Sequence, residues 1–455
     1  MTGSNVKSTE KMNALSQYLS LFEANRTAFE SVTSPAVSAL RLEAFRMLSE
    51  ATLSEKDATS LEAMIAPDRG INVNRIAMPV EIAASFKCAV PHMSTLLGLI
   101  IGDSFHATTS LDRQLPNGVT FMSLARASRE HPELLTQFGK IALADKAEVA
   151  LNNMMWQDGA LIHIARGTKV DRPLQLVKIF SGANMPMMAF RRLLIVVEED
   201  ASLQLLSCDH TQDRGEYFSD EIVEISLGDN ARLELCDIEE SSLTTSRYSS
   251  VWTRLGHDAR INHTTVTLTC GTTRNNVNVD IVNPGARSRL AGMAIVDKNM
   301  RIDNRTSVNH LSEHGTSDQM FKYVLDDEAR GKFEGCITVA PGAKFTEAYQ
   351  TNRNILASKN ARMNSNPWLE IYNDDVKCSH GASTGQLDPD ALFYMEQRGI
   401  PQPEAKVMLM QAFMVDIIDA VGIDGLRDRL RHLVETRFSG ADDRSCDACQ
   451  SHCRQ

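Results

Sequence analysis

The pattern of hydrophobic and polar positions changes twice along the 455-residue chain. In residues 1–150 the apolar positions recur at helical spacing, as do Leu15, Leu19 and Phe22, which fall on one helix face. In residues 151–388, short alternating runs rich in Val, Ile and Thr predict β-strands. Residues 389–438 return to helical spacing, and residues 439–455 are rich in cysteine. We therefore expect an N-terminal helical domain, a β-rich core, a C-terminal helical lobe and a flexible tail.

A short turn element recurs within the strand-rich region. A turn residue and then Ala or Thr precede a strand, and the steps between the second residues are 30, 28, 27, 30 and 27. These steps leave no room for crossover helices, so each repeat holds strands and turns. A steady period of this length predicts a parallel β-solenoid, with an antiparallel sandwich as the alternative. The six elements are Asp200-Ala201, Asn230-Ala231, Asp258-Ala259, Gly285-Ala286, Gly315-Thr316 and Gly342-Ala343.

A solenoid has two open ends, and the strand edges there must be capped or paired because their backbone groups lack partners. We expect the N-terminal helices to cap one end. In the C-terminal lobe, a mostly apolar stripe at helical spacing predicts either a packing face or a docking face for a second protein. Its members are Leu409, Ala412, Phe413, Asp416 and Ile417.

The composition limits the cellular compartments and the classes of partner that fit this protein. The net charge of −11 and the sequence pI near 5.6 argue against a nucleic-acid partner. No run of about 18 apolar residues predicts a membrane span. The first 25 residues lack the apolar core of a signal peptide, so we expect a cytoplasmic location. In a reducing compartment, most of the nine cysteines should be buried thiols rather than disulfides.

The stretch DDVKCSHGAST places Cys378 and His380 two positions apart. On a strand these side chains share one face, and both are good ligands for iron or zinc. The preceding Asp374 and Asp375 could orient the imidazole, and Lys377 could favour the thiolate. Two ligands cannot complete a tetrahedral shell, so a partner chain or external sulfide must supply the rest. A nucleophilic Cys–His pair fits this spacing poorly, and a buried cysteine beside a surface histidine is the plain alternative.

Four stretches in order along the chain carry a family resemblance. They are ALNNMMWQDGALIHIARGTKVDRPLQL, FEGCITVAPGAKFTEAYQTNRNIL, LEIYNDDVKCSHGASTGQLD and LFYMEQRGI. Together they resemble the domain shared by SufB and SufD, the scaffold subunits of the Suf iron–sulfur cluster assembly machinery. The resemblance covers residues 150–400 and the C-terminal helices, but it is poor before this stretch and absent after Phe438. It implies a right-handed parallel β-helix core with helical domains at both ends.

Within the family, the chain looks more like SufD than SufB. SufB carries a Glu-His-Glu style sequence where this chain has Cys378-Ser379-His380-Gly381, and a cysteine-bearing segment where this chain has Thr351-Asn352-Arg353-Asn354. The resemblance therefore implies a non-catalytic partner subunit that lacks the principal cluster-building cysteine. It also implies that His380, with Cys378 as a lesser contributor or a structural thiol, faces a transient iron–sulfur cluster at the SufB interface.

The resemblance further implies that the C-terminal lobe docks SufC, the ATPase of the system. The candidate contacts are Phe393, Tyr394, Phe413 and Ile417. The chain has no phosphate-binding loop of the Gly-x-x-x-x-Gly-Lys-Ser/Thr type, so we expect no ATP hydrolysis by this chain itself. ATP-driven movement of SufC would then be transmitted through this lobe to the SufB–SufD interface.

Two further groups of ligand-type residues carry weaker predictions. His310 and His314 are four apart, a metal spacing that needs a helix, whereas this region has a strand and turn pattern. The tail is compact enough to hold one zinc ion or an iron–sulfur cluster, although a flexible tail with incidental thiols is the simpler interpretation. Its candidate ligands are Cys446, Cys449, His452 and Cys453.

Two alternative functions remain at this point. A β-helix carbohydrate lyase or hydrolase would use clustered carboxylates, which Asp326-Asp327-Glu328 and Asp374-Asp375 could imitate. The absence of a secretion signal and the many cysteines count against it. A metal-free structural homodimer is the other alternative to a scaffold that pairs with SufB.

Overall fold

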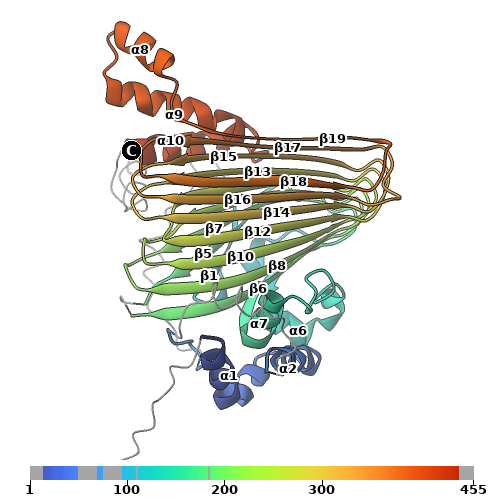
Figure 1. Ribbon diagram of the computed structural model, residues 1–455. Coiled ribbons are helices and arrows are strands. Elements are labelled where there is room, and N and C mark those ends of the chain that lie inside the picture. The colour runs from blue at the N-terminus through green and yellow to red at the C-terminus, as the bar shows by residue number, and fades with distance from the viewer. Residues whose placement is uncertain (1–13, 50–68, 75–94, 109–110, 183–184, 440–455) are drawn as a thin grey trace, which may run out of the picture.

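The core of the protein is a solenoid of parallel strands stacked along one axis (Figure 1). The structure, a computed structural model, describes residues 14–49, 69–74, 95–108, 111–182 and 185–439. Within these residues, nineteen strands form two sheets, and successive core strands alternate between them. Neighbouring core strands pair in parallel, so the predicted β-solenoid is confirmed and the antiparallel sandwich is wrong.

The two sheets run the length of the stack. The first sheet contains, in spatial order, β19 (Val376–Gly385), β17 (Thr346–Leu356), β15 (Thr316–Leu325), β13 (Arg287–Val296), β11 (Arg260–Thr269), β9 (Arg232–Glu240), β7 (Ser202–Thr211), β5 (Leu174–Phe180), β1 (Leu96–Ile101) and β2 (Ser104–Ala107). The second sheet contains β18 (Arg362–Ile371), β16 (Arg330–Val339), β14 (Arg301–His310), β12 (Thr272–Ile281), β10 (Ser246–Leu255), β8 (Tyr217–Leu227), β6 (Met187–Val197), β4 (Asp158–Ile164) and β3 (Val119–Ser123).

Alternate side chains of each strand point between the two sheets and form the interior. Leu203 and Leu205 of β7 and Val223 and Ile225 of β8 belong to one buried apolar cluster that runs through many coils. A strand with one face buried and one face toward solvent needs this two-residue period. The alternating runs of the sequence therefore form the strands that they predict.

The turns that lead from the second sheet to the first share one conformation. Asp200, Asn230 and Asp258 have left-handed backbones, with φ of 58°, 56° and 53°. Asp and Asn tolerate this region better than other non-glycine residues. The backbone N–H of Asp200 donates to the carbonyl of Asp229 in the next coil at 2.9 Å, and that of Asn230 donates to His257 at 2.7 Å. The turns thus form a ladder of hydrogen bonds beside the sheets.

Two of the six turn elements expected from the sequence lie elsewhere. In the fifth turn, His314 rather than Gly315 has the left-handed backbone, with φ of 58°. Gly315 takes the place that a buried alanine occupies in the earlier turns. In the sixth turn the left-handed residue is Phe345, three positions after Gly342. The period was predicted correctly, but the later turns are longer, and the small residues that mark the earlier turns are displaced in them.

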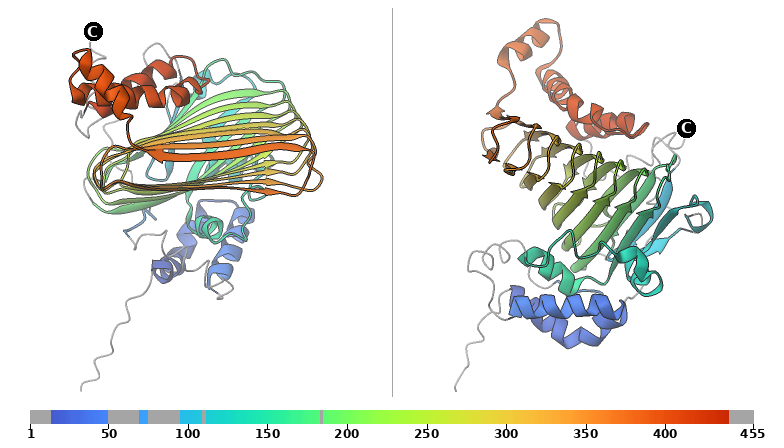
Figure 2. Two further views of the ribbon diagram at one scale, coloured as in Figure 1. Left: turned by 45° about the horizontal axis from the view of Figure 1, so that its top comes forward. Right: turned by 90° about the vertical axis from the view of Figure 1, so that its right-hand side faces the viewer.

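The N-terminal part differs from the all-helical domain that the sequence predicts. Strands β1, β2 and β3 lie before residue 150, and β1 pairs in parallel with β5. The helices α1 (Ala14–Ser31), α2 (Pro35–Ser49), α6 (Leu124–Glu130) and α7 (Ala147–Met155) lie beside the first coils (Figure 2). Tyr18 and Trp156 pack with Phe190 and Phe218 on the outer face of the second sheet. Short elements α5 (Leu111–Gln114) and η1 (Pro132–Leu135) complete this region.

Strands, rather than the expected helices, end the two sheets at the first coils. The antiparallel strands β2 and β3 are the end strands of the two sheets. They have four and five residues, and short end strands limit edge pairing. The helices cover the outer face of the second sheet at this end.

Three C-terminal helices follow β19, as the sequence predicts. They are α8 (Pro389–Gln397), α9 (Gln402–Asp419) and α10 (Leu426–Phe438). Ile417 and Ile418 of α9 and Leu430 of α10 pack on the outer face of the first sheet, in one cluster with Cys236 and Ile295. By contrast, α8 has no buried residue and projects from the stack (Figure 2).

A cluster of buried charges lies inside the first coils. The Lys178 Nζ atom lies 2.8 Å from an oxygen of Asp209 and 2.7 Å from an oxygen of Glu221. Arg247 and Arg191 also contact Asp209, at 3.1 Å and 2.8 Å. Burial by itself raises the pKa of Asp209, but these cations outweigh it and hold that pKa below its usual range. The cluster links strands of both sheets.

Candidate functional site

The solenoid ends on its C-terminal side in two long edge strands. Among the described residues, β18 pairs only with β16, and β19 pairs only with β17. Each therefore leaves one row of backbone N–H and C=O groups without a strand partner. Both strands have ten residues, and most of their side chains are exposed. We call this region the open end.

Cys378 and His380 point toward the solenoid axis at the open end. The register places Cys378 beside Ala348 and His380 beside Gln350. Ala348 and Gln350 are buried in the interior, so the two side chains of β19 continue interior rows beyond the last covered coil. As a result Cys378 is half-buried and His380 is exposed. The sequence correctly predicts that the two residues share one face of a strand.

A buried acceptor lies one coil below His380. The Nε2 atom of Gln350 donates to Oε1 of Gln319 at 3.2 Å. The Oε1 atom of Gln350 is buried and has no hydrogen-bond partner in the structure as described. A histidine that binds metal through one ring nitrogen needs an acceptor for the N–H of the other. Gln350 is therefore suited to orient His380, and the sequence patterns gave no reason to select it.

Amide side chains continue this polar interior beside β19. The Oδ1 atom of Asn352 accepts from Ser365 Oγ at 2.6 Å and from Asn354 Nδ2 at 2.7 Å. Asn354 also donates to Thr384 of β19 at 3.0 Å. The stretch that lacks the cysteine of SufB thus supplies hydrogen bonds that tie the last coil to the coil below.

The electrostatics of Cys378 favour a structural thiol. Burial raises the pKa of Cys378, which disfavours its thiolate. Lys377 does not offset this effect, because it lies on the opposite strand face and forms an ion pair with Glu347 at 2.9 Å. The expectation that Lys377 favours the thiolate is therefore wrong. Adjacent residues on a strand point to opposite faces, which the sequence argument did not take into account.

The acids before β19 do not contact the imidazole. Asp374 and Asp375 are exposed in the turn, and within the described residues the imidazole of His380 donates no hydrogen bond to either. The expectation that they orient the imidazole is not supported. In the same described part, no group of three or more His, Cys, Asp and Glu side chains is placed to hold a metal ion. Cys378 and His380 are thus two candidate ligands on one strand face, and their metal role stays a prediction.

His310 and His314 do not form a metal pair. His310 is buried, and its Nε2 atom lies 2.8 Å from Ser317 Oγ. Burial lowers the pKa of His310 to about 4, so the ring is neutral at neutral pH. The ring of His314 stacks on Phe345 in a turn, with the centroids 4.9 Å apart. The strand and turn that carry the two residues agree with the sequence pattern, which lacks the helix that this metal spacing needs.

The candidate docking residues of the C-terminal lobe separate into two groups. Phe393 and Tyr394 are 62% and 60% exposed on α8. Ile417 is fully buried against the first sheet, and Phe413 is half-buried beneath Lys322, whose Nζ atom lies 4.8 Å from the ring centroid. Ile417 is therefore a packing residue, and its selection as a docking contact is wrong. The true packing face of α9 is rotated from the expected stripe, because it also includes Met414 and Ile418.

Three further predictions concern the tail, membrane spans and the remaining cysteines. Residues 440–455 are not described, so the tail ligands Cys446, Cys449, His452 and Cys453 stay predictions. Across the described helices, none is both long enough and apolar enough to span a membrane. Cys208, Cys236, Cys270 and Cys336 are free and buried, as expected.

A solenoid of parallel strands with helices near both ends is the architecture that the family resemblance implied, and sequence comparison shows the family directly. The chain belongs to the SufB/SufD family, because the model of the SUF system FeS cluster assembly SufBD core domain matches residues 179–413. The model of the SufBD protein N-terminal region matches residues 12–176, most of which precede the stretches that carry the resemblance.

Individual relatives support a SufD-type member of this family. The iron–sulfur cluster assembly protein SufD of Escherichia coli is 29% identical over 301 residues, which are 65% of this chain and 71% of that protein. SufD of Bacillus subtilis is 25% identical over 342 residues, covering 74% of this chain and 78% of its own length. The SufBD family protein slr0076 of Synechocystis is 27% identical over 376 residues, covering 81% and 83% of the two chains.

These findings establish a role in iron–sulfur cluster assembly at the level of the family. The family is of the scaffold type, which agrees with a non-catalytic chain. The alternative of a carbohydrate-active enzyme finds no support in them.

Proposed function

We propose that this chain is the non-catalytic partner of a SufB-type subunit and that the two pair through the open end. Nascent iron–sulfur clusters would form between them as cargo, with His380 facing the cluster. The observation that carries the proposal is the exposed imidazole on a terminal strand whose outer edge has no strand partner among the described residues.

The strand edges support pairing at this place. An unpaired edge of ten residues attracts another strand, and natural proteins usually blunt or cover such edges. Exposed large apolar side chains also gather here, which is typical of a protein interface. They include Phe345, Tyr349, Trp368, Ile371 and Tyr372.

The cluster role of His380 is tested by its replacement in the complete assembly. The chain is co-expressed with its own SufB-type and SufC-type partners, and iron and sulfide are measured after anaerobic purification. We expect His380→Ala to lower the cluster content by about tenfold, the lower range for the loss of a metal-site contact. Ser379→Ala is the matched control, because Ser379 is an exposed neighbour on the opposite strand face.

Co-purification of the partner subunits distinguishes the cluster role of His380 from the pairing of the two subunits. If His380→Ala keeps its partners and also keeps its cluster content, the cluster role is wrong while pairing stands. If the wild-type chain recovers no SufB-type subunit and sediments as a dimer of itself, the structural homodimer is correct instead.

We further propose that α8 and the outer face of α9 dock the SufC-type ATPase. Phe393 and Tyr394 lie exposed on α8, and Met408 and Val415 are 44% and 37% exposed on α9. The pair Phe393→Ala and Tyr394→Ala should abolish recovery of the ATPase in a pull-down, because exposed aromatic anchors dominate such interfaces. Leu311→Ala, at a residue that is 48% exposed in a turn of the solenoid, is the control. Unchanged recovery with the double variant would overturn the assignment.

A further inference from the structure

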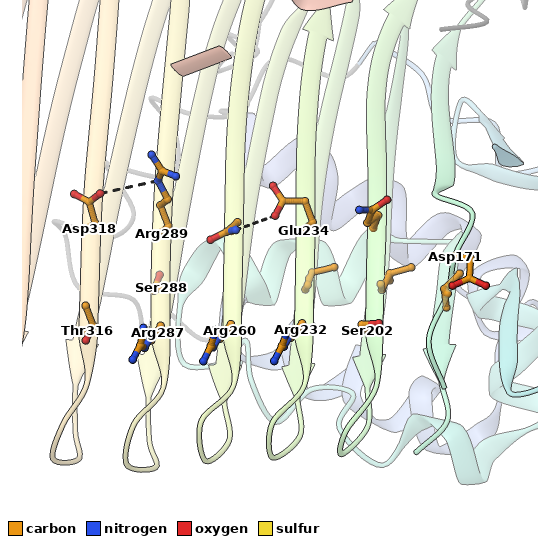
Figure 3. A pocket seen from close by; sticks show the side chains of 15 residues that line it. Asp171, Ser202, Arg232, Glu234, Arg260, Arg287, Ser288, Arg289, Thr316 and Asp318 are labelled. Carbon is orange, nitrogen blue, oxygen red and sulfur yellow. Dashed lines mark hydrogen bonds and ion pairs between the residues drawn. The ribbon is translucent and has the colours of Figure 1, made fainter. Parts of the chain in front are cut away.

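A groove crosses the outer face of the first sheet near the starts of its strands (Figure 3). Its volume is about 760 Å³, within the range of small-molecule sites. The strands β7, β9, β11, β13 and β15 each contribute their first residues to it. The open end lies further along the stack, so the groove is separate from the candidate cluster site.

Three arginines form one row along the floor of this groove. Arg232, Arg260 and Arg287 are the first residues of β9, β11 and β13, and they are direct neighbours in the parallel register. Adjacent strands lie about 4.8 Å apart, so the three side chains recur at that spacing. Figure 3 shows them extending side by side in the same direction. The hydroxyl residues Ser202 and Thr316 continue the row on either side.

The three guanidinium groups have no partner among the described residues, whereas two neighbouring acids are already engaged. Within that part of the chain, no side-chain hydrogen bond or ion pair involves Arg232, Arg260 or Arg287. In the next row, Glu234 accepts from Asn262 Nδ2 at 2.9 Å and from the backbone N–H of Gly422 at 2.7 Å. Asp318 faces Arg289 at 4.0 Å. The three positive charges are therefore not neutralised by any side chain of the described residues.

Such a row is unfavourable for the isolated fold. Like charges directly opposite each other on neighbouring strands repel, and these three stand in sequence. The chain as a whole carries a net charge of −11, so a general excess of basic residues does not explain the row. An anion bound across the row would remove the repulsion. Arginine is suited to that role, because its planar guanidinium binds phosphate with two parallel hydrogen bonds.

We propose that this groove binds a linear oligophosphate, whose anionic oxygens are held by Arg232, Arg260 and Arg287. The hydroxyl groups of Ser202 and Thr316 stand four strand spacings apart, about 19 Å, so a short phosphate chain can reach only one of them at either end of the row. The residues that line the groove include no aromatic side chain on which a nucleobase could stack. The phosphate chain itself is therefore the recognised part, and a nucleotide should bind no better than inorganic tripolyphosphate.

An acidic peptide fits the row less well. On an extended peptide, carboxylates on one face recur about 6.8 Å apart, whereas the arginines recur about every 4.8 Å. An oligophosphate carries anionic oxygens on every unit, so each rung of the row meets a charge. The two ligand classes are distinguished by titration with tripolyphosphate and with a short oligoglutamate.

The test is isothermal titration of the full chain with inorganic tripolyphosphate at near-physiological salt. We expect binding that the double variant Arg260→Ala and Arg287→Ala weakens by about tenfold or more, because two charge-assisted contacts are lost. The variant Arg260→Lys and Arg287→Lys keeps the charge but loses the two-pronged geometry, so it should bind less tightly than the wild type.

The chain provides a control with matched charge. Arg301 and Arg330 are neighbouring first residues of β14 and β16 on the second sheet, and Arg362 of β18 extends them to an exposed row of three that lies outside the groove, so this control tests the groove rather than the row. Their double replacement by alanine should change the affinity by less than about twofold, as exposed charges at a distance are screened by salt. Equal losses in both alanine variants, absence of tripolyphosphate binding by the wild type, or tighter binding of oligoglutamate would each overturn the proposal. Far-ultraviolet circular dichroism checks that all variants remain folded.

Discussion

The two ends of the solenoid differ in what completes them. In the first coils, short antiparallel strands end the sheets, helices cover one outer face, and the interior holds a charged cluster around Lys178. At the open end, β18 and β19 are long and exposed, and the interior polar groups are neutral amides such as Gln350 and Asn352. The strands of the first coils are therefore covered by other parts of the same chain, whereas β18 and β19 leave exposed surface on which a partner could pack.

This difference predicts where substitutions act. A buried charge cluster that loses one member leaves the others without compensation, so the first coils should respond through folding stability. The open end is already in contact with water, so substitutions there should change assembly and leave folding nearly intact. Four predictions test this contrast.

The largest effect is expected for Lys178→Met in the first coils. Asp209 and Glu221 would lose a buried cation at 2.8 Å and 2.7 Å. Removing one member of a buried ion pair costs about 3–5 kcal/mol of unfolding free energy. Chemical denaturation measures this loss. Lys377→Met at the open end is the matched control, since Lys377 is exposed in its pair with Glu347, and it should leave the denaturation midpoint unchanged.

The second prediction concerns Asp220, which is buried on β8 beside α7. Burial raises the pKa of Asp220 to about 8. Below pH 4 the carboxyl is protonated in both states. Between about pH 4 and pH 8 only the unfolded state ionises, so rising pH lowers the unfolding free energy by about 1.4 kcal/mol per pH unit from this group. Above about pH 8 the contribution becomes constant.

Asp220→Asn should remove that dependence and stabilise the protein at pH 7 by on the order of 2–4 kcal/mol. Asn152, whose Nδ2 atom lies 3.3 Å from Asp220, also has a buried Oδ1 atom that an amide could satisfy. Denaturation at several pH values measures the slope. An exposed site, Asp424→Asn, should retain the wild-type slope, and a wild-type slope in Asp220→Asn would refute the prediction.

The third effect is expected at the open end. Ile371, the last residue of β18, continues the interior row above Val339 but is 42% exposed because no described coil covers it. If the proposed pairing is correct, Ile371→Asp should weaken binding of the proposed SufB-type partner by about tenfold, or about 1.4 kcal/mol, with little change in thermal unfolding. Leu243→Asp, at a residue that is 45% exposed in a turn of the solenoid, serves as the control. A large loss of stability in Ile371→Asp would contradict the contrast between the ends.

The smallest change in free energy is expected for Gln350→Leu, which removes the acceptor below His380. The loss of one neutral hydrogen bond to Gln319 changes the unfolding free energy by about 1 kcal/mol. The informative measurement is nitrogen NMR of the imidazole, which should change from one tautomer to a mixture. Gln350→Glu keeps an acceptor oxygen and should restore the single tautomer. An identical tautomer ratio in all three proteins would show that Gln350 does not orient His380.

The sequence predicted the repetitive features of the fold better than its irregular ones. The alternating runs and the regular recurrence of the turn element predicted the stacked strands, since each coil repeats the same local requirements. Strands β2 and β3, before residue 150, were missed because they have only four and five residues. Strand β1 was missed because its continuous apolar run LLGLII has no alternation that distinguishes a strand from a buried helix. The resemblance was also poor over the N-terminal part, although the N-terminal family model matches residues 12–176.

The candidate site was partly visible in the sequence. The two-residue spacing of Cys378 and His380 gave their shared face, because strand alternation is a local property. The exposure of Ile417 was predicted wrongly, since helical spacing gives a stripe but does not say what covers it. Gln350 and the row of Arg232, Arg260 and Arg287 were missed because their relation crosses from one coil to the next.

The sequence alone determined the solenoid class, the helices of the C-terminal lobe and the strand that carries the imidazole, because hydrophobic period and turn chemistry act between near neighbours in the chain. Only the tertiary structure decided which coil is the last, which side chains of α9 are covered, and which arginines stand in one row. These properties depend on the register between coils and on what lies above each strand. Such contacts join residues distant in sequence, so no local pattern reports them.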